Sequence, residues 1–233
     1  MNKYEFDKFA DEYQQLHSKN IKLSGETPEF FSEYKIIDLK KLTKQYGLPE
    51  SPTILDFGCG VGSSIGMMVK HFPAADIHGI DVSEKSIAIA RQRFGNVAQI
   101  QAYDGEKLPY DDQSFDIVFA ACVFHHIPQD SYQAIFQEIR RVLKEQGIFV
   151  IFEHNPLNPL TLHAVNTCPF DENAVLIRSG KLKTMLKEKV FAHVKYTYRI
   201  FFPGVLARFR PLERYLTWVP LGAQYYIVSY GYK

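Results

Sequence analysis

A glycine-rich loop between an apolar run and a helical pattern most constrains the fold of this chain. Residues 53–57 form the apolar run, and Gly58, Gly60 and Gly62 follow it at alternate positions before a helical pattern over 63–71. Glycine in such a loop allows backbone angles that other residues avoid and a close approach to a ligand. The loop predicts a ligand-binding strand–loop–helix unit of an α/β fold, and an ordinary glycine turn is the alternative.

Apolar runs and helical patterns alternate along the chain after this loop. This alternation predicts a parallel sheet covered by helices on both faces, a Rossmann-like doubly wound α/β fold. Two later runs bring the mostly parallel sheet to seven strands. The expected strands are 53–57, 77–80, 98–103, 115–123, 148–152, 191–202 and 224–232, and the expected helices are 63–71, 84–94, 132–143 and 182–189.

The two ends of the chain carry additions to this core. Residues 1–50 predict an N-terminal helical cover, in which Thr27 caps a second helix and Pro28 occupies its first position. Residues 51–233 predict the main domain. Within it, residues 201–222 are longer than a hairpin needs and predict an insertion before the last strand.

Composition narrows the class of protein. Of 233 residues, 46% are hydrophobic and 23% charged, as in an ordinary globular protein. The formal net charge of +1 disfavours a nucleic-acid partner, since such partners usually require a basic excess. Three cysteines form no disulfide framework, and the N-terminus has no apolar signal region, so we expect a cytoplasmic protein. No apolar run approaches the roughly 20 residues of a membrane span.

Acidic residues lie at the ends of the first three expected strands. Asp56 would oppose the pyrophosphate of a dinucleotide, and Ser63 replaces the third glycine of the usual fingerprint, so a cationic ligand such as S-adenosylmethionine fits better. Asp81 suits a bond to ribose hydroxyls, with a helix cap by Ser83 as the alternative. Asp104 suits an adenine amino group, with a turn as the alternative.

Taken together, the glycine loop, the acids, the D-G-E-K-L-P-Y segment and the F-D-I-V-F-A run resemble the class I S-adenosylmethionine-dependent methyltransferases. The resemblance covers residues 50–155. It is nearest to the small-molecule group that includes ubiquinone and menaquinone C-methyltransferases and tailoring enzymes. It implies S-adenosylmethionine as the cofactor, and a lid contact at Tyr13, for which core packing is the alternative. The implied cofactor-binding residues are Asp56, Gly58, Cys59, Gly60 and Gly62 at the methionine part, Asp81 and Val82 at the ribose, Asp104, Gly105 and Glu106 at the adenine, and Ala121, Cys122 and His126 beside the methionine end.

Candidate catalytic residues follow the fourth and fifth expected strands. Methyl transfer is an in-line displacement that needs a base only where the nucleophile must lose a proton. His154 is the first candidate base, with Glu153 beside it, and His126 is the second. The alternative is that Glu153 and Asn155 brace the following turn. The Cys122-x-x-His125-His126 spacing lacks a second ligand pair, so we predict no metal site.

The sequence therefore predicts methyl transfer from S-adenosylmethionine to a small-molecule acceptor, such as a saccharide, a lipid-linked compound or another secondary metabolite. The alternatives are a non-catalytic S-adenosylmethionine-binding module, a nicotinamide-dependent oxidoreductase and an aminopropyltransferase. Arginines and aromatic residues alternate over 199–218. They suggest a flap for an anionic or lipid-linked acceptor or a peripheral membrane patch, with an extra solvated helix as the alternative.

Overall fold

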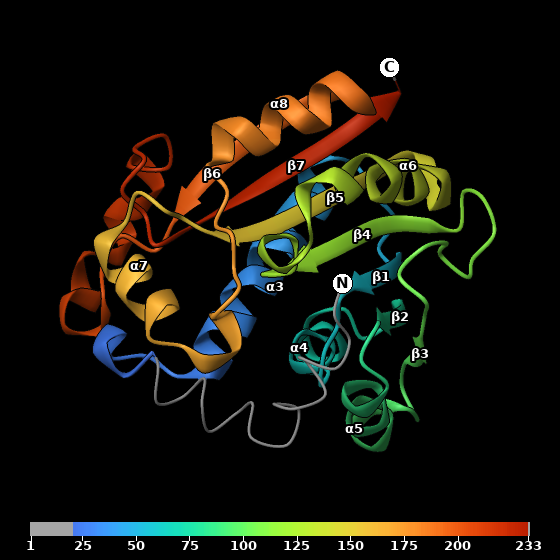
Figure 1. The fold of residues 1–233 in the computed structure, drawn as a ribbon, viewed down its shortest axis with the longest axis horizontal. Coiled ribbons are helices and arrows are strands. Elements are labelled where there is room, and N and C mark those ends of the chain that lie inside the picture. Colours follow the sequence, from blue (N-terminus) through green and yellow to red (C-terminus); the bar gives the residue numbers. More distant parts are fainter. Residues whose placement is uncertain (1–20, 233) are drawn as a thin grey trace.

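A single mixed sheet organises the molecule (Figure 1). The computed structural model describes residues 21–232. The strand order is β3-β2-β1-β4-β5-β7-β6, parallel from β3 to β5, with β7 antiparallel to both of its neighbours. This order confirms the predicted seven-stranded doubly wound sheet. The strands are β1 (Thr53–Phe57), β2 (Asp76–Asp81), β3 (Gln99–Ala102), β4 (Phe115–Ala121), β5 (Leu143–His154), β6 (Phe191–Arg199) and β7 (Gln224–Tyr232).

Local sequence signals set the helix ends. Thr27 caps α3 as expected, since its Oγ1 accepts a hydrogen bond from the backbone N–H of Phe30 at 3.3 Å, and Pro28 begins the helix. The helices are α3 (Pro28–Gln45), α4 (Ser63–His71), α5 (Glu84–Phe94), α6 (Tyr132–Val142), α7 (Pro159–Asn166) and α8 (Ser179–Lys189). Short 3-10 segments, η1 (Lys22–Ser24), η2 (Phe124–His126), η3 (Gln129–Ser131), η4 (Pro169–Asp171) and η5 (Gly204–Tyr215), lie in the connections.

The sheet separates two hydrophobic cores. Alternate residues of each strand point to opposite faces, so Leu55 packs into one core and Ile54 into the other. One core joins the sheet to α6 and α8, through residues such as Phe136 and Leu182. The other joins it to α3, α4 and α5, through residues such as Leu39. Both faces are therefore covered, which explains why the strands read as continuous apolar runs.

Three segments of the chain meet beyond the carboxyl ends of the parallel strands. Figure 1 shows α7, the red segment before β7 and the blue start of the described chain together on one side. The Asn158 side chain donates to the Leu221 carbonyl at 2.7 Å, and Thr161 Oγ1 donates to the Ala223 carbonyl at 2.9 Å. These bonds fix the segment after β5 against the segment before β7. The sheet order reverses between β1 and β4, the point where α/β folds bind ligands.

Some expected elements differ from those found. The sequence did not predict α7. β6 ends at Arg199, short of the expected residue 202, because the next residue, Ile200, has a left-handed backbone angle of φ +62°. The predicted insertion over 201–222 contains η5. The first helix of the predicted N-terminal cover and Tyr13 lie outside the described residues. Over 21–232, no helix has the length and apolarity to cross a membrane.

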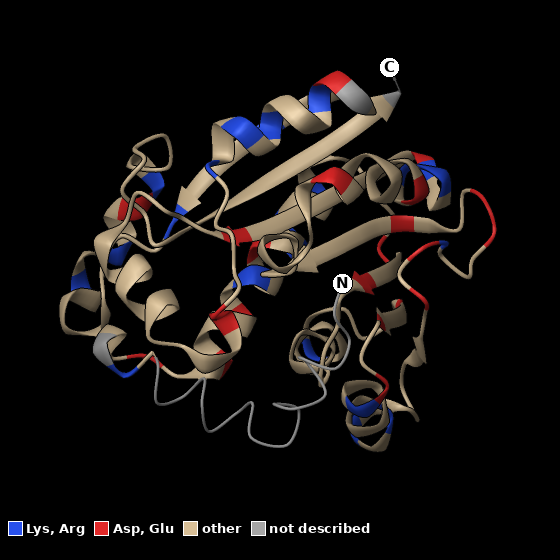
Figure 2. Ribbon diagram, viewed as in Figure 1, with Lys and Arg blue, Asp and Glu red and all other residues tan. Residues whose placement is uncertain are grey.

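Charged residues are spread over the described molecule. Figure 2 shows Lys and Arg on several helices, with Asp and Glu on neighbouring strands and loops. Lys181, Lys183 and Lys187 lie on α8, which packs on the sheet far along the chain from the glycine loop. This view therefore shows no single face that gathers the basic residues.

Candidate functional site

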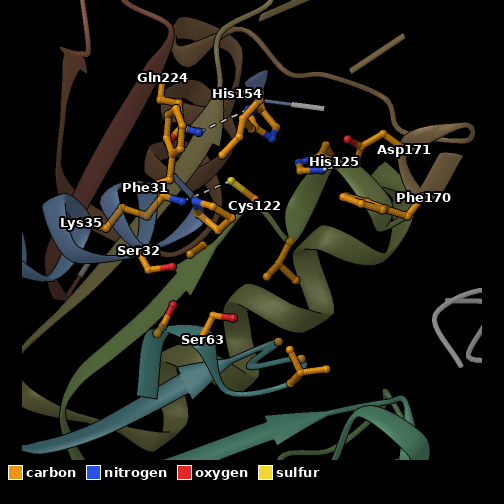
Figure 3. A pocket seen from close by; sticks show the side chains of 18 of the residues that line it. Phe31, Ser32, Lys35, Ser63, Cys122, His125, His154, Phe170, Asp171 and Gln224 are labelled. Carbon is orange, nitrogen blue, oxygen red and sulfur yellow. Dashed lines mark hydrogen bonds and ion pairs between the residues drawn. The ribbon is translucent and has the colours of Figure 1, made fainter. Parts of the chain in front are cut away.

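A cavity of about 380 Å³ lies at the carboxyl ends of the parallel strands. The glycine loop forms one wall, α3 a second, and α7 with η4 a third. Figure 3 shows Ser63 on one side of this cavity and His154 on the other, with Cys122 between them. The loop that follows β1 and the polar residues that follow β4 and β5 therefore share one enclosed space.

The glycine loop is held by hydrogen bonds to β2. The backbone N–H groups of Gly58 and Cys59 donate to the Ile80 carbonyl at 2.8 and 2.9 Å. Gly58 has φ +75°, and a Cβ added there would lie 2.6 Å from Cγ2 of Val123. Only glycine fits this position, because of both the backbone angle and the close approach of Val123. The loop is thereby pressed against the end of β4, with Gly60 facing the cavity.

Asp81 ends β2 and joins the glycine loop to α5. Its Oδ2 accepts from the N–H of Gly60 at 2.9 Å, and its Oδ1 accepts from the N–H of Ser83 at 2.9 Å. Ser83 also caps α5, since its Oγ accepts from the N–H of Ser86 at 3.1 Å. Ser83 is therefore the cap of α5, and Asp81 lines the cavity. The contact of Asp81 with ribose hydroxyls stays a prediction.

Asp56 lies beneath the loop and is 1% exposed. Among the described residues, its Oδ2 has no hydrogen-bond partner. Burial, together with the nearby charge of Asp81, raises the pKa of Asp56 to about 8. A buried carboxyl of this kind is stabilised in its charged form when a cation comes close. The two acids and the glycine backbone thus fit a ligand that has a positive charge and hydroxyl groups.

Cys122, His154 and Lys35 form a polar group at the centre of the cavity. The Lys35 Nζ atom lies 3.8 Å from Cys122 Sγ (Figure 3). Burial opposes ionisation of Cys122, but the charge of Lys35 and a hydrogen bond with His154 lower its pKa to about 7. Burial likewise opposes the charged form of His154. The charge of Cys122 and its hydrogen bond with His154 outweigh the effect of burial, so the pKa of His154 is raised. His154 Nδ1 also lies 3.4 Å from the Gln224 amide nitrogen.

A second polar group surrounds His125. Its Nδ1 lies 2.5 Å from Oε2 of Glu153, and its Nε2 lies 3.6 Å from Oδ1 of Asp171. The Nε2 atom of His126 lies 3.4 Å from the same Asp171 oxygen. The two carboxylates raise the pKa of His125 against the effect of burial, whereas burial and the neighbouring His125 lower the pKa of His126. Glu153 is fully buried and also accepts from the N–H of Phe124 at 2.8 Å.

The structure brings most of the predicted site residues to this cavity. Glu153 lies behind His125 rather than at the cavity surface, so it positions His125. Asn155 braces the turn, as the alternative interpretation held, since its Nδ2 donates to the carbonyls of Pro220 and Gly222 at 3.1 and 2.7 Å. The predicted residues that line the cavity are Gly58, Cys59, Gly60, Asp81, Val82, Ala121, Cys122, His126 and His154, and those that do not are Asp56, Gly62, Asp104, Gly105, Glu106 and Glu153.

The sequence analysis missed several residues of the cavity. Lys35 is buried on α3, and a lysine between the buried Tyr34 and Ile36 was a detectable signal. The Asn158-Pro159 pair was another, since Asn158 Oδ1 accepts from the N–H of Thr161 at 3.0 Å and caps α7. Asp171 had no local signal, because only the path of the chain after α7 places it beside the histidines.

Comparison with known proteins identifies the central segment. A sequence family described as a methyltransferase domain matches residues 54–147. Residues 54–147 belong to this methyltransferase-domain family. The match starts in β1 and covers the glycine loop, Asp81 and Asp104. It confirms the predicted family, the class I methyltransferases, and agrees with S-adenosylmethionine as the cofactor of this methyltransferase domain.

Curated relatives share the methyltransferase domain. The chain is 34% identical over 120 residues to a demethylmenaquinone methyltransferase of Chlorobaculum tepidum, covering 52% of this chain and 48% of the relative. It is 34% identical over 117 residues to a sterol 24-C-methyltransferase of Gibberella zeae, covering 48% of this chain and 30% of the relative. The chain thus spans about half or less of the length of these relatives.

Solved structures extend the likeness to the whole described fold. A methyltransferase from Thermotoga maritima has a TM-score of 0.68 at 18% identity, covering 97% of this chain and 98% of that one. The phosphoethanolamine N-methyltransferase 2 of Haemonchus contortus has a TM-score of 0.65 at 16% identity, covering 98% of this chain and 60% of that one. At these identities the likeness concerns the fold alone, and it extends over nearly the whole chain, beyond the matched residues 54–147.

Proposed function

We propose that this chain transfers a methyl group from S-adenosylmethionine to a small-molecule acceptor by in-line displacement. One observation carries the proposal: the glycine loop with Asp81 and the group of Cys122 and His154 line the same cavity. S-adenosylmethionine supplies a methyl carbon that its sulfonium already activates. The protein therefore has to hold the acceptor atom in line with that carbon and, where the atom carries a proton, remove it.

The glycine-loop side of the cavity would hold the cofactor. Asp81 faces the cavity at the end of β2, where an acid can accept from ribose hydroxyls. Asp56 lies beneath the loop, and its Oδ2, which has no hydrogen-bond partner among the described residues, would act on the positive charge of the methionine part from behind the cavity wall. Val82 follows β2 and Tyr103 follows β3, and both line the cavity, which supports a position for the adenine on the side of Asp104. These roles agree with the resemblance stated for the same residues.

The histidine side would hold the acceptor. His154 and His126 both line the cavity and are the candidates for the proton-accepting group. His154 is favoured because the hydrogen bond with Cys122 and the nearby Gln224 amide hold its ring in place. Glu153 would act through His125, as a positioning residue rather than a catalytic one.

The surroundings of the cavity favour an apolar acceptor, such as a lipid-linked compound, over a saccharide. Leu160 and Pro203 line the cavity itself, and further exposed apolar side chains surround them on the two segments that Asn158 joins. Two of the curated relatives are named for menaquinone precursors and sterols, which are apolar molecules. The exposed side chains are Leu157, Leu160, Leu162, Val205, Leu206, Leu212, Tyr215, Trp218 and Leu221.

This apolar rim, defined by the side chains just listed, also fits a peripheral contact with a membrane. Arg208 and Arg214 are exposed within it, each over an aromatic ring, so the rim combines apolar and basic groups as membrane-surface segments do. Trp218 is the single tryptophan of the chain and is 77% exposed. Its fluorescence should shift to shorter wavelength on anionic vesicles at low salt. An unchanged spectrum, together with no sedimentation of the protein with the vesicles, would contradict the membrane contact.

Methyl transfer itself is tested with S-adenosylmethionine that carries a labelled methyl group. The protein is incubated with a lipid extract and, separately, with a water-soluble metabolite extract, and label is counted in the product. We expect label in the lipid fraction, reduced at least tenfold in His154→Ala and unchanged in His163→Ala, whose side chain is exposed on α7. Cofactor binding without label in either fraction would instead support a non-catalytic binding module.

A further inference from the structure

We propose that His125, His126 and Asp171 form a binding site for a divalent transition-metal ion at the acceptor end of the cavity. Each residue offers one ligand atom, and these three atoms lie within 4.8 Å of one another. All three residues line the cavity, and Figure 3 shows His125 and Asp171 next to each other beside Phe170. Two imidazoles and one carboxylate are a ligand set that zinc and other first-row divalent ions accept.

The distances from Asp171 to the two histidines suit a shared ion. Asp171 Oδ1 lies 3.6 Å from Nε2 of His125 and 3.4 Å from Nε2 of His126. Direct hydrogen bonds between charged groups are shorter, about 2.7–2.9 Å. Two atoms that bind one zinc ion at about 2.0–2.1 Å in tetrahedral geometry are separated by about 3.4 Å. The carboxylate oxygen therefore lies from both ring nitrogens at the distance expected between two ligands of one ion.

Glu153 orients one of the proposed ligands. Its Oε2 lies 2.5 Å from Nδ1 of His125, and its Oε1 is fixed by the N–H of Phe124 at 2.8 Å. A carboxylate on the far ring nitrogen of a ligating histidine holds the ring and increases its basicity, a recurrent arrangement in metal sites. Here it directs Nε2 of His125 toward Asp171.

The three ligands come from distant parts of the chain. His125 and His126 follow β4, and Asp171 lies on η4, after β5 and α7. The sequence around Cys122 lacked a second ligand pair, and the fold adds one ligand, Asp171, from a distant segment. Cys122 itself is engaged with Lys35 and His154, so the proposed site uses the histidines and Asp171 alone.

Three protein ligands leave a coordination position for another molecule on the cavity side. An oxygen atom of the acceptor would bind there, and the ion would lower the pKa of an acceptor hydroxyl. This favours acceptors with a phenolic or enolic oxygen, and the inference about the acceptor rests on the proposed function. Binding of the ion does not, because its ligands belong to the chain alone.

Metal binding is tested on the full chain after treatment with a chelator, without any acceptor. Zn²⁺ is titrated by calorimetry, and Co²⁺ is titrated by visible absorption, which reports ligand type and geometry. We expect one ion per chain, and binding at least tenfold weaker in His126→Ala and Asp171→Asn. His163→Ala is the matched control, since it removes an exposed histidine of α7 and should leave binding unchanged. Circular dichroism of each variant verifies that it is folded.

Three results would overturn the proposal. The first is no binding of either ion to the wild-type chain, as expected if a proton rather than a metal is shared by His125 and Asp171. The second is binding that Asp171→Asn leaves unchanged. The third is binding that Cys122→Ser removes and Asp171→Asn retains, which would place the ion elsewhere. Titration of the same samples with S-adenosylmethionine distinguishes failure of the metal site from failure of the proposed function. If the cofactor binds and the metal does not, only the metal site is refuted.

Discussion

The Nδ1 atom of His125 lies 2.5 Å from Oε2 of Glu153, and both side chains are 1% exposed. Glu153 belongs to β5, and His125 follows the neighbouring strand β4, so the contact joins the ends of two strands at the cavity. The charge of His125 lowers the pKa of Glu153 against the effect of burial. In the metal-free protein the two groups therefore form an ion pair that supports the fold and orients a cavity residue.

Removing the charge of Glu153 should destabilise the fold. Glu153→Gln leaves a buried imidazolium without its main partner, and breaking a buried ion pair costs about 3–5 kcal/mol. We expect the free energy of unfolding, measured by urea denaturation at pH 7, to fall by about 3 kcal/mol or more. Glu145→Gln is the control on the same strand, where the side chain is exposed and the change should stay within about 0.5 kcal/mol. Equal stability of the two variants would contradict the ion pair.

Gly58 should tolerate no side chain. A Cβ there would approach Val123 to 2.6 Å at φ +75°, so Gly58→Ala displaces the loop from the end of β4. We expect a lower melting temperature and at least tenfold weaker cofactor binding. Gly180→Ala on α8 is the matched control, since nothing lies within 4 Å of its added Cβ and alanine favours helix, so its stability should rise or stay unchanged. A Gly58→Ala variant as stable as Gly180→Ala would show that the loop is adaptable.

Cys122 should react as a thiolate near neutral pH. Its pKa of about 7 means that the thiolate form increases as pH rises from 6 to 8. Alkylation by iodoacetamide, followed by peptide mass spectrometry, should therefore reach half its maximal rate near pH 7. Lys35→Met removes the positive charge that favours the thiolate, so the midpoint should move upward, toward the ordinary value of 9.0.

Two internal checks accompany this experiment. Burial and the charges of Asp56 and Asp81 raise the pKa of Cys59, so its peptide in the same digest should remain far less modified. S-adenosylmethionine should protect Cys122, because the thiol lines the cavity. A midpoint that is the same in wild type and Lys35→Met would show that Lys35 does not act on the thiol.

Asp56 should favour cofactor binding at the expense of stability. Its folded-state pKa of about 8 lies above the ordinary value of 3.8, so the folded state binds the proton more tightly than the unfolded state. Ionisation of Asp56 therefore destabilises the ligand-free fold progressively as pH rises from about 4 to about 8. We expect Asp56→Asn to be at least as stable as wild type at pH 8 by urea denaturation, yet to bind S-adenosylmethionine at least tenfold more weakly. Tighter binding by the variant would exclude a charge contact with the cofactor.

The sequence predicted the sheet well because its signals are local. Apolar runs and the caps at Thr27 and Ser83 depend on neighbours within a few residues, and the structure confirms both caps. The path of the chain after β5 depends on long-range contacts, such as that between Asn158 and Leu221. For that reason α7 was missed, and so was the position of Asp171 beside His126.

For the site, the positions of residues at strand ends were predictable, and the orientations of their side chains were not. Strand ends follow from the alternating pattern, so residues such as Asp81 and His154 were placed at one edge of the sheet, and both line the cavity. The orientation of a side chain at a strand end depends on packing, and Glu153 points into the protein toward His125 instead of into the cavity. Lys35 was missed because its role arises only when α3 packs against the end of β4.

Calorimetric titration with S-adenosylmethionine, S-adenosylhomocysteine and NADH shows whether the glycine loop and Asp81 bind S-adenosylmethionine. We expect the first two to bind and NADH not to bind. Asp81→Ala should weaken binding about 10- to 100-fold, since hydrogen bonds to a charged group contribute about 1.5–3 kcal/mol. Asp76→Asn, at the other end of β2, should bind as wild type does. Binding of NADH alone would exclude S-adenosylmethionine as the cofactor, and equal binding by the two variants would exclude a role of Asp81 in binding it.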